Sequence, residues 1–244
     1  MDKAVEEKLR RWAEWYNQPR FFEQDPIAFP RRFAARMSKA QGELGFGGEM
    51  GNPCLQDVEI AAVFAAHFAW GRRAMIVRDC ERLFEEMNWQ PFAYVQEGRY
   101  RSGNDSIHRT VKWSEVAAIC SRLKEFYQSE KSLESLSASE MRTAVYGQKE
   151  DAKAPNKKIH MLRRWMVRDD GKVDLGLWKS TDKRDLVIPL DVHVYRQATE
   201  LGLTKRRAKD IATAMEITDA FRELFPDDPA KGDFALFGYG VNNA

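Results

Sequence analysis

The sequence predicts an all-α protein, and three observations support this fold class. Nearly every long segment repeats apolar residues at the spacing of one helix face. Prolines and short polar or glycine-rich stretches separate these segments. Only one short segment, residues 187–190, has the composition of a strand. Helices are expected at about residues 4–17, 55–70, 72–88, 113–127, 137–147, 157–168, 191–201, 205–224 and 229–239.

Local signals set the limits of the helices in the first half of the chain. Residues 4–17 place Leu9, Trp12 and other apolar side chains on one face, and the prolines that follow, Pro19 to Pro30, predict short turns. Residues 41–53 are glycine-rich and are expected to form an exposed loop. The helix from residue 55 is apolar all round and therefore buried. The amphipathic helix that follows ends before Pro91.

The second half of the chain alternates polar connections and helices. Residues 98–111 are polar and predict a loop. Residues 148–156 form a polar linker, and we expect a boundary between two lobes there. Residues 1–244 are thus expected to form one two-lobed helical domain, in which the chain crosses between the lobes more than once. The helix over 157–168 carries an apolar stripe that includes Ile159, Leu162 and Trp165.

Composition describes a globular protein without a metal or cofactor motif. Of 244 residues, 43% are hydrophobic and 31% are charged, which is typical of a folded soluble chain. No apolar run approaches the roughly 18 residues of a membrane span, and the charged N-terminus does not resemble a secretory signal. The three cysteines and four histidines show no metal-ligand spacing. We therefore expect a cytoplasmic protein with no cofactor and no membrane partner.

The net charge of +2 hides three clusters of basic residues. The first, residues 157–168, holds five lysines and arginines and no acid. The second is Lys205-Arg206-Arg207, and the third is a looser group at Arg99, Arg101, His108, Arg109 and Lys112. Clusters of this kind suit a polyanion such as a nucleic acid, although each is equally compatible with a solvated helix face.

Asp191 stands at the head of a predicted helix. Pro189 disfavours helix just before itself, an apolar helical pattern begins after Asp191, and Gly202 is a suitable residue to end it. Asp191 therefore has the position of an N-cap, whose carboxylate accepts backbone N–H groups. Local features alone support this structural role.

The segment around Asp191 resembles a known family. The order Pro-Leu-Asp-Val-His-Val, then a helix, then Leu-Gly-Leu is similar to the helix-hairpin-helix (HhH-GPD) DNA glycosylases, in which the aspartate of this segment is catalytic. The usual Leu-Pro-Gly-Val-Gly hairpin does not precede Asp191, so the resemblance does not extend to standard hairpin binding of DNA.

A second resemblance covers most of the chain. It resembles a family of uncharacterised bacterial proteins that is placed near the archaeal 8-oxoguanine DNA glycosylases. The segments that carry the resemblance are Asp25-Pro26-Ile27, Asp57-Val58-Glu59-Ile60, Ala69-Trp70-Gly71, Arg164-Trp165-Met166-Val167-Arg168, Asp174-Leu175-Gly176-Leu177-Trp178 and Asp233-Phe234-Ala235-Leu236-Phe237-Gly238. The resemblance implies a two-lobed glycosylase-like architecture with a cleft between the lobes.

The resemblance also implies a lysine that attacks the sugar, and two lysines compete for this role. In the archaeal enzymes the lysine lies far upstream of the aspartate, at the head of a helix, and Lys157 matches this position because it precedes Asp191 by 34 residues. The helical wheel instead places Lys158 at the edge of the apolar stripe and Lys157 on the polar side. We favour Lys157, and Lys158 is then expected to contact DNA.

Other residues are assigned around this pair. Arg164 and Arg168 share the polar side of the helix with Lys157 and are expected to follow the DNA backbone. His193, in the first turn after Asp191, is a candidate for a phosphate contact. The aromatic candidates for stacking on a flipped base are Trp70, Trp178 and Phe237, although aromatic residues at helical spacing more often belong to the core.

The function implied is base excision by a DNA glycosylase with AP lyase activity on an oxidised purine such as 8-oxoguanine. Its partner would be double-stranded DNA with a damaged base, and we expect a monomer associated with the nucleoid. One alternative is a nucleic-acid-binding protein of the same fold without catalysis. A helical protein–protein adaptor is a third hypothesis, which the basic helix over 157–168 disfavours.

Overall fold

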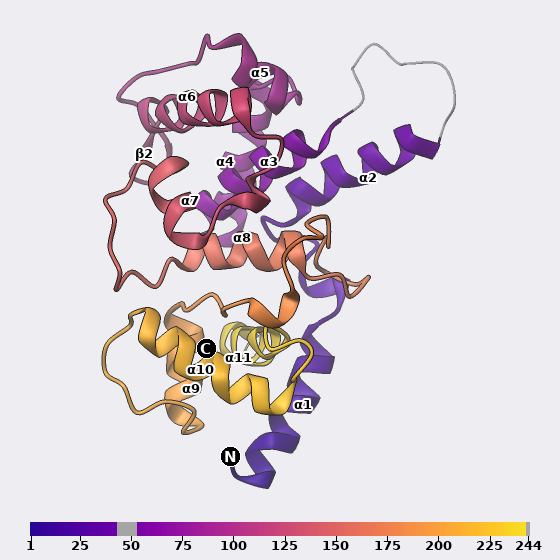
Figure 1. Ribbon diagram of the computed structural model, residues 1–244, viewed down its shortest axis with the longest axis vertical. Coiled ribbons are helices and arrows are strands. Elements are labelled where there is room, and N and C mark those ends of the chain that lie inside the picture. Colours follow the sequence, from indigo (N-terminus) through magenta and orange to yellow (C-terminus); the bar gives the residue numbers. More distant parts are fainter. Residues whose placement is uncertain (43–52, 243–244) are drawn as a thin grey trace. The chain divides into compact units, whose positions relative to one another are not determined.

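The computed structural model describes residues 1–42 and 53–242, and it confirms the all-α class (Figure 1). Within these ranges the chain forms eleven α-helices, three short 3₁₀ helices and one two-stranded hairpin. The chain divides into two compact units. Met1–Phe22 and Asp151–Ala244 form the first, here called the terminal unit, and Glu23–Glu150 form the second, here called the central unit. The chain passes from the terminal unit to the central unit after Phe22 and returns after Glu150. The return point lies inside the predicted linker 148–156.

The terminal unit brings the two ends of the chain together. Its α-helices are α1 (Lys3–Tyr16), α8 (Lys157–Val167), α9 (Val192–Glu200), α10 (Ile211–Leu224) and α11 (Lys231–Asn242), and its 3₁₀ helices are η1 (Pro19–Phe21) and η3 (Lys183–Asp185). Helix α11 packs against both α1 and α9. Trp12 of α1 stacks on Tyr239 of α11 with ring centroids 3.7 Å apart. Gly238 permits this close packing, because a Cβ there would lie 2.4 Å from the ring of Tyr16.

The central unit is built around one buried helix, α3. Every residue of α3 from Asp57 to Phe68 is buried, as its continuous apolar sequence predicts. Helices α2, α4 and α5 all pack against it. The elements of this unit are α2 (Ala28–Gly42), α3 (Leu55–Phe68), α4 (Arg73–Glu86), α5 (Pro91–Glu97), β1 (Ser106–His108), β2 (Val111–Lys112), α6 (Trp113–Ser129), η2 (Leu133–Ser135) and α7 (Ala138–Ala144).

Two buried carboxylates, Asp57 and Glu59, lie in the first two turns of α3. Asp57 accepts the backbone N–H groups of Cys54 and Phe92, at 2.8 and 2.9 Å. Glu59 is completely buried and accepts bonds from Tyr127, Ser132 and the backbone of Leu133. These carboxylates are therefore saturated by structural bonds that join α3 to its neighbours.

Four predictions about secondary structure need correction. Residues 28–42 form α2 and not short turns, because Pro30 lies in the first turn, where its missing N–H costs no helical bond. Residues 98–111 include the hairpin strand β1. Residues 187–190 are extended but pair with no strand in the described chain, and α10 begins only at Ile211. The loop predicted over 41–53 falls mostly outside the described residues.

Candidate functional site

Asp191 occupies the N-cap of α9, as the sequence predicts. Its backbone is extended, with φ −111° and ψ −174°, and its Oδ1 atom accepts the N–H groups of His193 and Val194 at 2.8 and 2.9 Å. Both bonds go to the same oxygen. Oδ2 accepts no hydrogen bond from the described residues, and the side chain is only half-buried. The carboxylate is therefore held in one orientation while one of its oxygens stays available.

Helix α9 begins and ends where the local signals place it. Leu186, Ile188 and Leu190 are buried, which anchors the extended segment that delivers Asp191 to the helix head. The helix ends at Glu200, and Gly202 follows with φ +72°, the left-handed conformation that favours glycine. The position of Asp191 is thus fixed from both sides.

His193 faces α11. Its Nδ1 lies 3.2 Å from the carbonyl oxygen of Gly240, which can only accept, so Nδ1 is the donor. The ring also meets Phe237 edge-on, with centroids 6.3 Å apart. These contacts fix the orientation of the imidazole with a proton on Nδ1. The phosphate contact predicted for His193 would need a second proton on Nε2, because a neutral ring with Nδ1 as donor presents Nε2 as an acceptor.

Lys157 and Lys158 are the first two residues of α8. Asn156 precedes them in the left-handed conformation, with φ +44°, and both lysines are half-buried. Asp191 forms no ion pair within the described chain, so neither ammonium group reaches its carboxylate at ion-pair distance. The choice between Lys157 and Lys158 stays a prediction.

The prediction that Arg164 and Arg168 lie on an exposed polar face is wrong. They are only 4% and 1% exposed. Arg164 binds Asp174 and Asp233. Arg168 binds Asp228 at 2.9 Å, Asp170 at 2.7 Å and Asp174 at 3.1 Å. The helical wheel could not show this arrangement, because the aspartates come from other segments. Both guanidinium groups are occupied, so we no longer assign them to the DNA backbone.

This buried ion network shifts the pKa values of its carboxyl groups. Burial raises the pKa of Asp233 to about 6, against the lowering effect of the Arg164 charge, and the negative charge of Asp191 raises it further. Asp170 is less deeply buried. Desolvation raises its pKa, but the charge of Arg168 and the hydrogen bonds from Lys172, Asn17 and Val173 together lower it to about 2. Asp191 is therefore close enough to Asp233 for their charges to interact, which places the N-cap of α9 beside the network.

The aromatic candidates have three different environments. Trp178 is 1% exposed and belongs to the core, so its predicted stacking on a base is corrected. Phe237 is half-buried beside His193. Trp70 belongs to the central unit and is 40% exposed, with the guanidinium of Arg109 4.4 Å from its ring centroid. Base stacking by Phe237 and Trp70 stays a prediction.

An exposed basic loop connects α9 to α10. Lys205, Arg206, Arg207 and Lys209 are all exposed. The hydroxyl of Tyr195 donates to the backbone carbonyls of Arg206 and Arg207, at 2.9 and 3.3 Å. The sequence showed the charge of this segment but predicted helix there. The structure instead places four cations on a loop in the same unit as Asp191.

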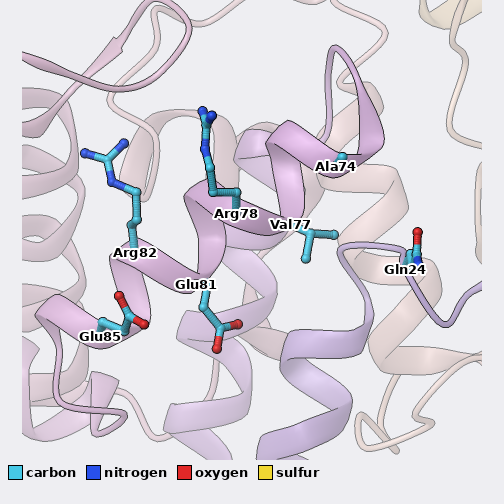
Figure 2. Close-up of a pocket in the computed structure, with 7 residues that line it drawn as sticks. All are labelled: Gln24, Ala74, Val77, Arg78, Glu81, Arg82 and Glu85. Atoms are coloured by element: carbon cyan, nitrogen blue, oxygen red, sulfur yellow. The ribbon is translucent and has the colours of Figure 1, made fainter.

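A shallow groove of about 540 Å³ runs along α4 in the central unit (Figure 2). Arg78 and Arg82 line it together with Glu81 and Glu85, so its walls carry both signs of charge. Among the described residues, no group of three or more histidine, cysteine, aspartate or glutamate side chains could hold a metal ion. No helix in these residues is long and apolar enough to cross a membrane.

The fold and the site together define an all-helical protein. It carries an aspartate at a helix N-terminus, with one carboxylate oxygen fixed by backbone N–H groups, next to a buried network of arginines and aspartates. The chain belongs to the DUF2400 family, which is described as a protein family of unknown function. The family model matches residues 53–242, more than three quarters of the chain. No curated protein and no solved structure matches the chain.

Proposed function

We propose that the protein is a DNA glycosylase with AP lyase activity, which removes an oxidised purine such as 8-oxoguanine from double-stranded DNA. The observation that carries the proposal is the state of the Asp191 carboxylate. Two backbone N–H groups fix one oxygen, and the other has no hydrogen-bond donor in the described chain. A charge that is oriented before the substrate arrives needs no reorganisation during the reaction.

Asp191 would act on the sugar. As the bond between the base and C1′ breaks, positive charge develops on the deoxyribose, and the available oxygen of Asp191 would stabilise it. The deoxyribose must be presented to this oxygen, which requires the nucleotide to leave the base stack. The resemblance of the segment from Pro189 to Val194 to the catalytic segment of glycosylases supports this role.

A lysine at the head of α8 would act as the nucleophile, and we favour Lys157 over Lys158. Its neutral amine attacks C1′, a C–N bond forms, and the base departs with the electron pair of the glycosidic bond and takes up a proton. The sugar ring then opens to a Schiff base. Loss of a proton from C2′ expels the 3′ phosphate and nicks the strand.

The exposed loop between α9 and α10 would hold the DNA backbone in place of the buried arginines of α8. Lys205, Arg207 and Lys209 are exposed cations, and the Tyr195 hydroxyl holds the backbone of this loop against α9. Because helix α9 carries Asp191 at one end and this loop at the other, phosphate contacts at the loop would orient the strand relative to the carboxylate.

The test is borohydride trapping of the Schiff base on duplexes that contain 8-oxoguanine, uracil or an abasic site. We expect wild-type protein to form a covalent complex with 8-oxoguanine DNA. Asp191→Asn keeps the N-cap, since asparagine caps about as well as aspartate, and we expect it to lose base removal while its stability is unchanged. Lys157→Ala should lose trapping, with Lys158→Ala as the matched control. The proposal fails if wild type traps no DNA, or if all variants trap like wild type.

One observation favours a second function, a nucleic-acid-binding protein of this fold without catalysis. Asp191 is engaged as a helix cap and has no lysine at ion-pair distance in the described chain. Such a protein would bind DNA with a steep dependence on salt. It would form no covalent complex on any of the three duplexes, so the same trapping assay separates the two functions.

A further inference from the structure

A buried ion pair underlies one surface of the central unit. Asp79 of α4 and His108 of β1 are 1% and 0% exposed, and the Oδ2 atom of Asp79 lies 2.8 Å from Nδ1 of His108. The other ring nitrogen, Nε2, lies 3.0 Å from the backbone carbonyl of Trp70. The carboxylate and the carbonyl therefore hold the imidazole from two sides.

Two arginines are fixed at the surface by the same carboxylate. Arg78 contacts Oδ1 of Asp79 at 2.8 Å and Arg82 approaches it at 3.7 Å, while their side chains are 64% and 43% exposed. Arg82 also donates to the carbonyl of Ile107 at 3.4 Å. Both side chains extend from α4 in the same direction, and Glu81 extends the opposite way (Figure 2). One helical turn separates the two arginines, a rise of about 6 Å.

Arg109 adds a third exposed cation to this cluster. It follows His108 directly, in the left-handed conformation with φ +53°, and its guanidinium lies 4.4 Å from the ring centroid of Trp70. The Trp70 ring in turn meets the ring of His108 edge-on, at 5.7 Å. Arg109 is thus joined to Asp79 through Trp70 and His108.

The cluster has a clear excess of positive charge at its surface. The acid that it contacts, Asp79, is buried and already paired with His108. Asp79 contacts Arg78 and Arg82, and Arg109 adds a third positive charge that has no acid in contact among the described residues. Glu85 of α4 lines the groove together with Arg78 and Arg82. Glu81, on the same helix, points away and approaches Arg32 at 3.6 Å. An arginine held by a buried carboxylate loses less conformational freedom on binding, and its planar fork matches a phosphate.

We propose that Arg78, Arg82 and Arg109 form a phosphate-binding surface through which the central unit holds the backbone of duplex DNA. The choice of ligand rests on the proposed function. The three arginines contact phosphate oxygens without reading bases, so this surface adds affinity but no sequence preference. Of these three arginines only Arg109 belongs to the third basic cluster of the sequence, and Arg78 and Arg82 are added to it by the fold.

The test measures how the affinity for DNA depends on salt. A fluorescein-labelled duplex with a tetrahydrofuran abasic analogue is titrated with full-length protein, and anisotropy is recorded at several salt concentrations. The variant is Arg78→Gln/Arg82→Gln/Arg109→Gln, which leaves Asp79 paired with His108. The matched control, Arg99→Gln/Lys131→Gln/Lys149→Gln, removes the same charge from exposed positions of the same unit. Circular dichroism verifies that both variants are folded.

Each phosphate contact contributes about 0.9 to the slope of log affinity against log salt, so three contacts contribute about 2.7. Over a fourfold rise in salt, wild type should therefore lose about 40-fold more affinity than the variant. The matched control should keep the wild-type slope. The inference is overturned if the variant and the matched control have equal slopes, or if wild type does not bind the duplex.

The same experiment separates this inference from the proposed function. Trapping by the wild-type protein at saturating DNA and low salt tests the chemistry, and the salt slope of the variant tests the surface. If wild type forms no covalent complex but the triple arginine variant has a smaller salt slope, the glycosylase proposal is refuted and the phosphate-binding surface is supported. Trapping by wild type, together with an unchanged slope in the variant, supports the glycosylase and refutes the surface.

Discussion

Replacing Arg168 by methionine should destabilise the protein strongly. Its guanidinium binds Asp170, Asp174 and Asp228, and the side chain is 1% exposed. Asp228 and Asp170 are 18% and 14% exposed and can regain water, but the Asp174 side chain is completely buried and would keep only Arg164, at 3.3 Å. Breaking a buried ion pair from one side costs about 3–5 kcal/mol, because a buried charge loses its partner. For a chain of this size the melting temperature should fall by roughly 6–20 °C.

Urea unfolding followed by tryptophan fluorescence measures this loss, since Trp165 lies in the same helix. Two comparison variants test the cause. Asp228→Asn removes a partner that water can replace and should cost only about 1–2 kcal/mol. Arg168→Met/Asp174→Asn removes the stranded charge together with its partner, so it should be less damaging than the sum of the single variants. A loss below about 1 kcal/mol for Arg168→Met, or an additive double variant, would refute the reasoning.

Three further predictions concern the same unit. Burial raises the pKa of Asp233 from 3.8 to about 6. The neutral form of Asp233 therefore contributes about 3 kcal/mol of stability below pH 4, and this contribution is lost as the pH rises through 6. Asp233→Asn should remove this pH dependence of the free energy of unfolding. Burial and the Arg163 charge lower the pKa of His160 from 6.5 to about 4. The neutral form of His160 therefore stabilises the fold above pH 6.5, and this contribution is lost as the pH falls through 4. The urea midpoint of His160→Gln should change less between pH 7 and pH 5 than that of wild type. Asp191→Ala should cost about 0.5–2 kcal/mol in thermal unfolding, whereas Asp191→Asn should cost little, and equal losses would contradict the cap.

The sequence predicts α9 well because the signals that define this helix are local. Pro189 prevents helix before it, Asp191 caps it and Gly202 ends it, and each acts within a few residues of its own position. The start of α10 was misplaced for the opposite reason. The segment 205–210 contains good helix formers, but the hydroxyl of Tyr195 holds it as a loop, and Asp210 caps the helix after it. No pattern within the segment encodes a contact with another helix.

The arginines of α8 show the same limit for the candidate site. A helical wheel places a side chain on a face, but it cannot show what that face meets. Arg164 and Arg168 are buried because Asp174, Asp228 and Asp233, which lie 6 to 69 positions along the chain, surround them. An aspartate within an otherwise apolar segment, as at Asp233, is the one sequence signal that could have indicated such a network, since an unpaired buried charge is costly.

The buried network also changes the meaning of the resemblance on which the functional prediction rests. Three of the segments that carry the resemblance contribute to one buried ion network. The first supplies Arg164 and Arg168, the second supplies Asp174, and the third supplies Asp233. These segments therefore identify a way of holding α8 against α11, and they say little about chemistry. Asp191 differs from them because its carboxylate is half-buried, fixed by one oxygen and available through the other. A functional test should therefore replace Asp191 by asparagine, which keeps the N-cap of α9. Substitutions in the network would abolish activity through loss of stability alone.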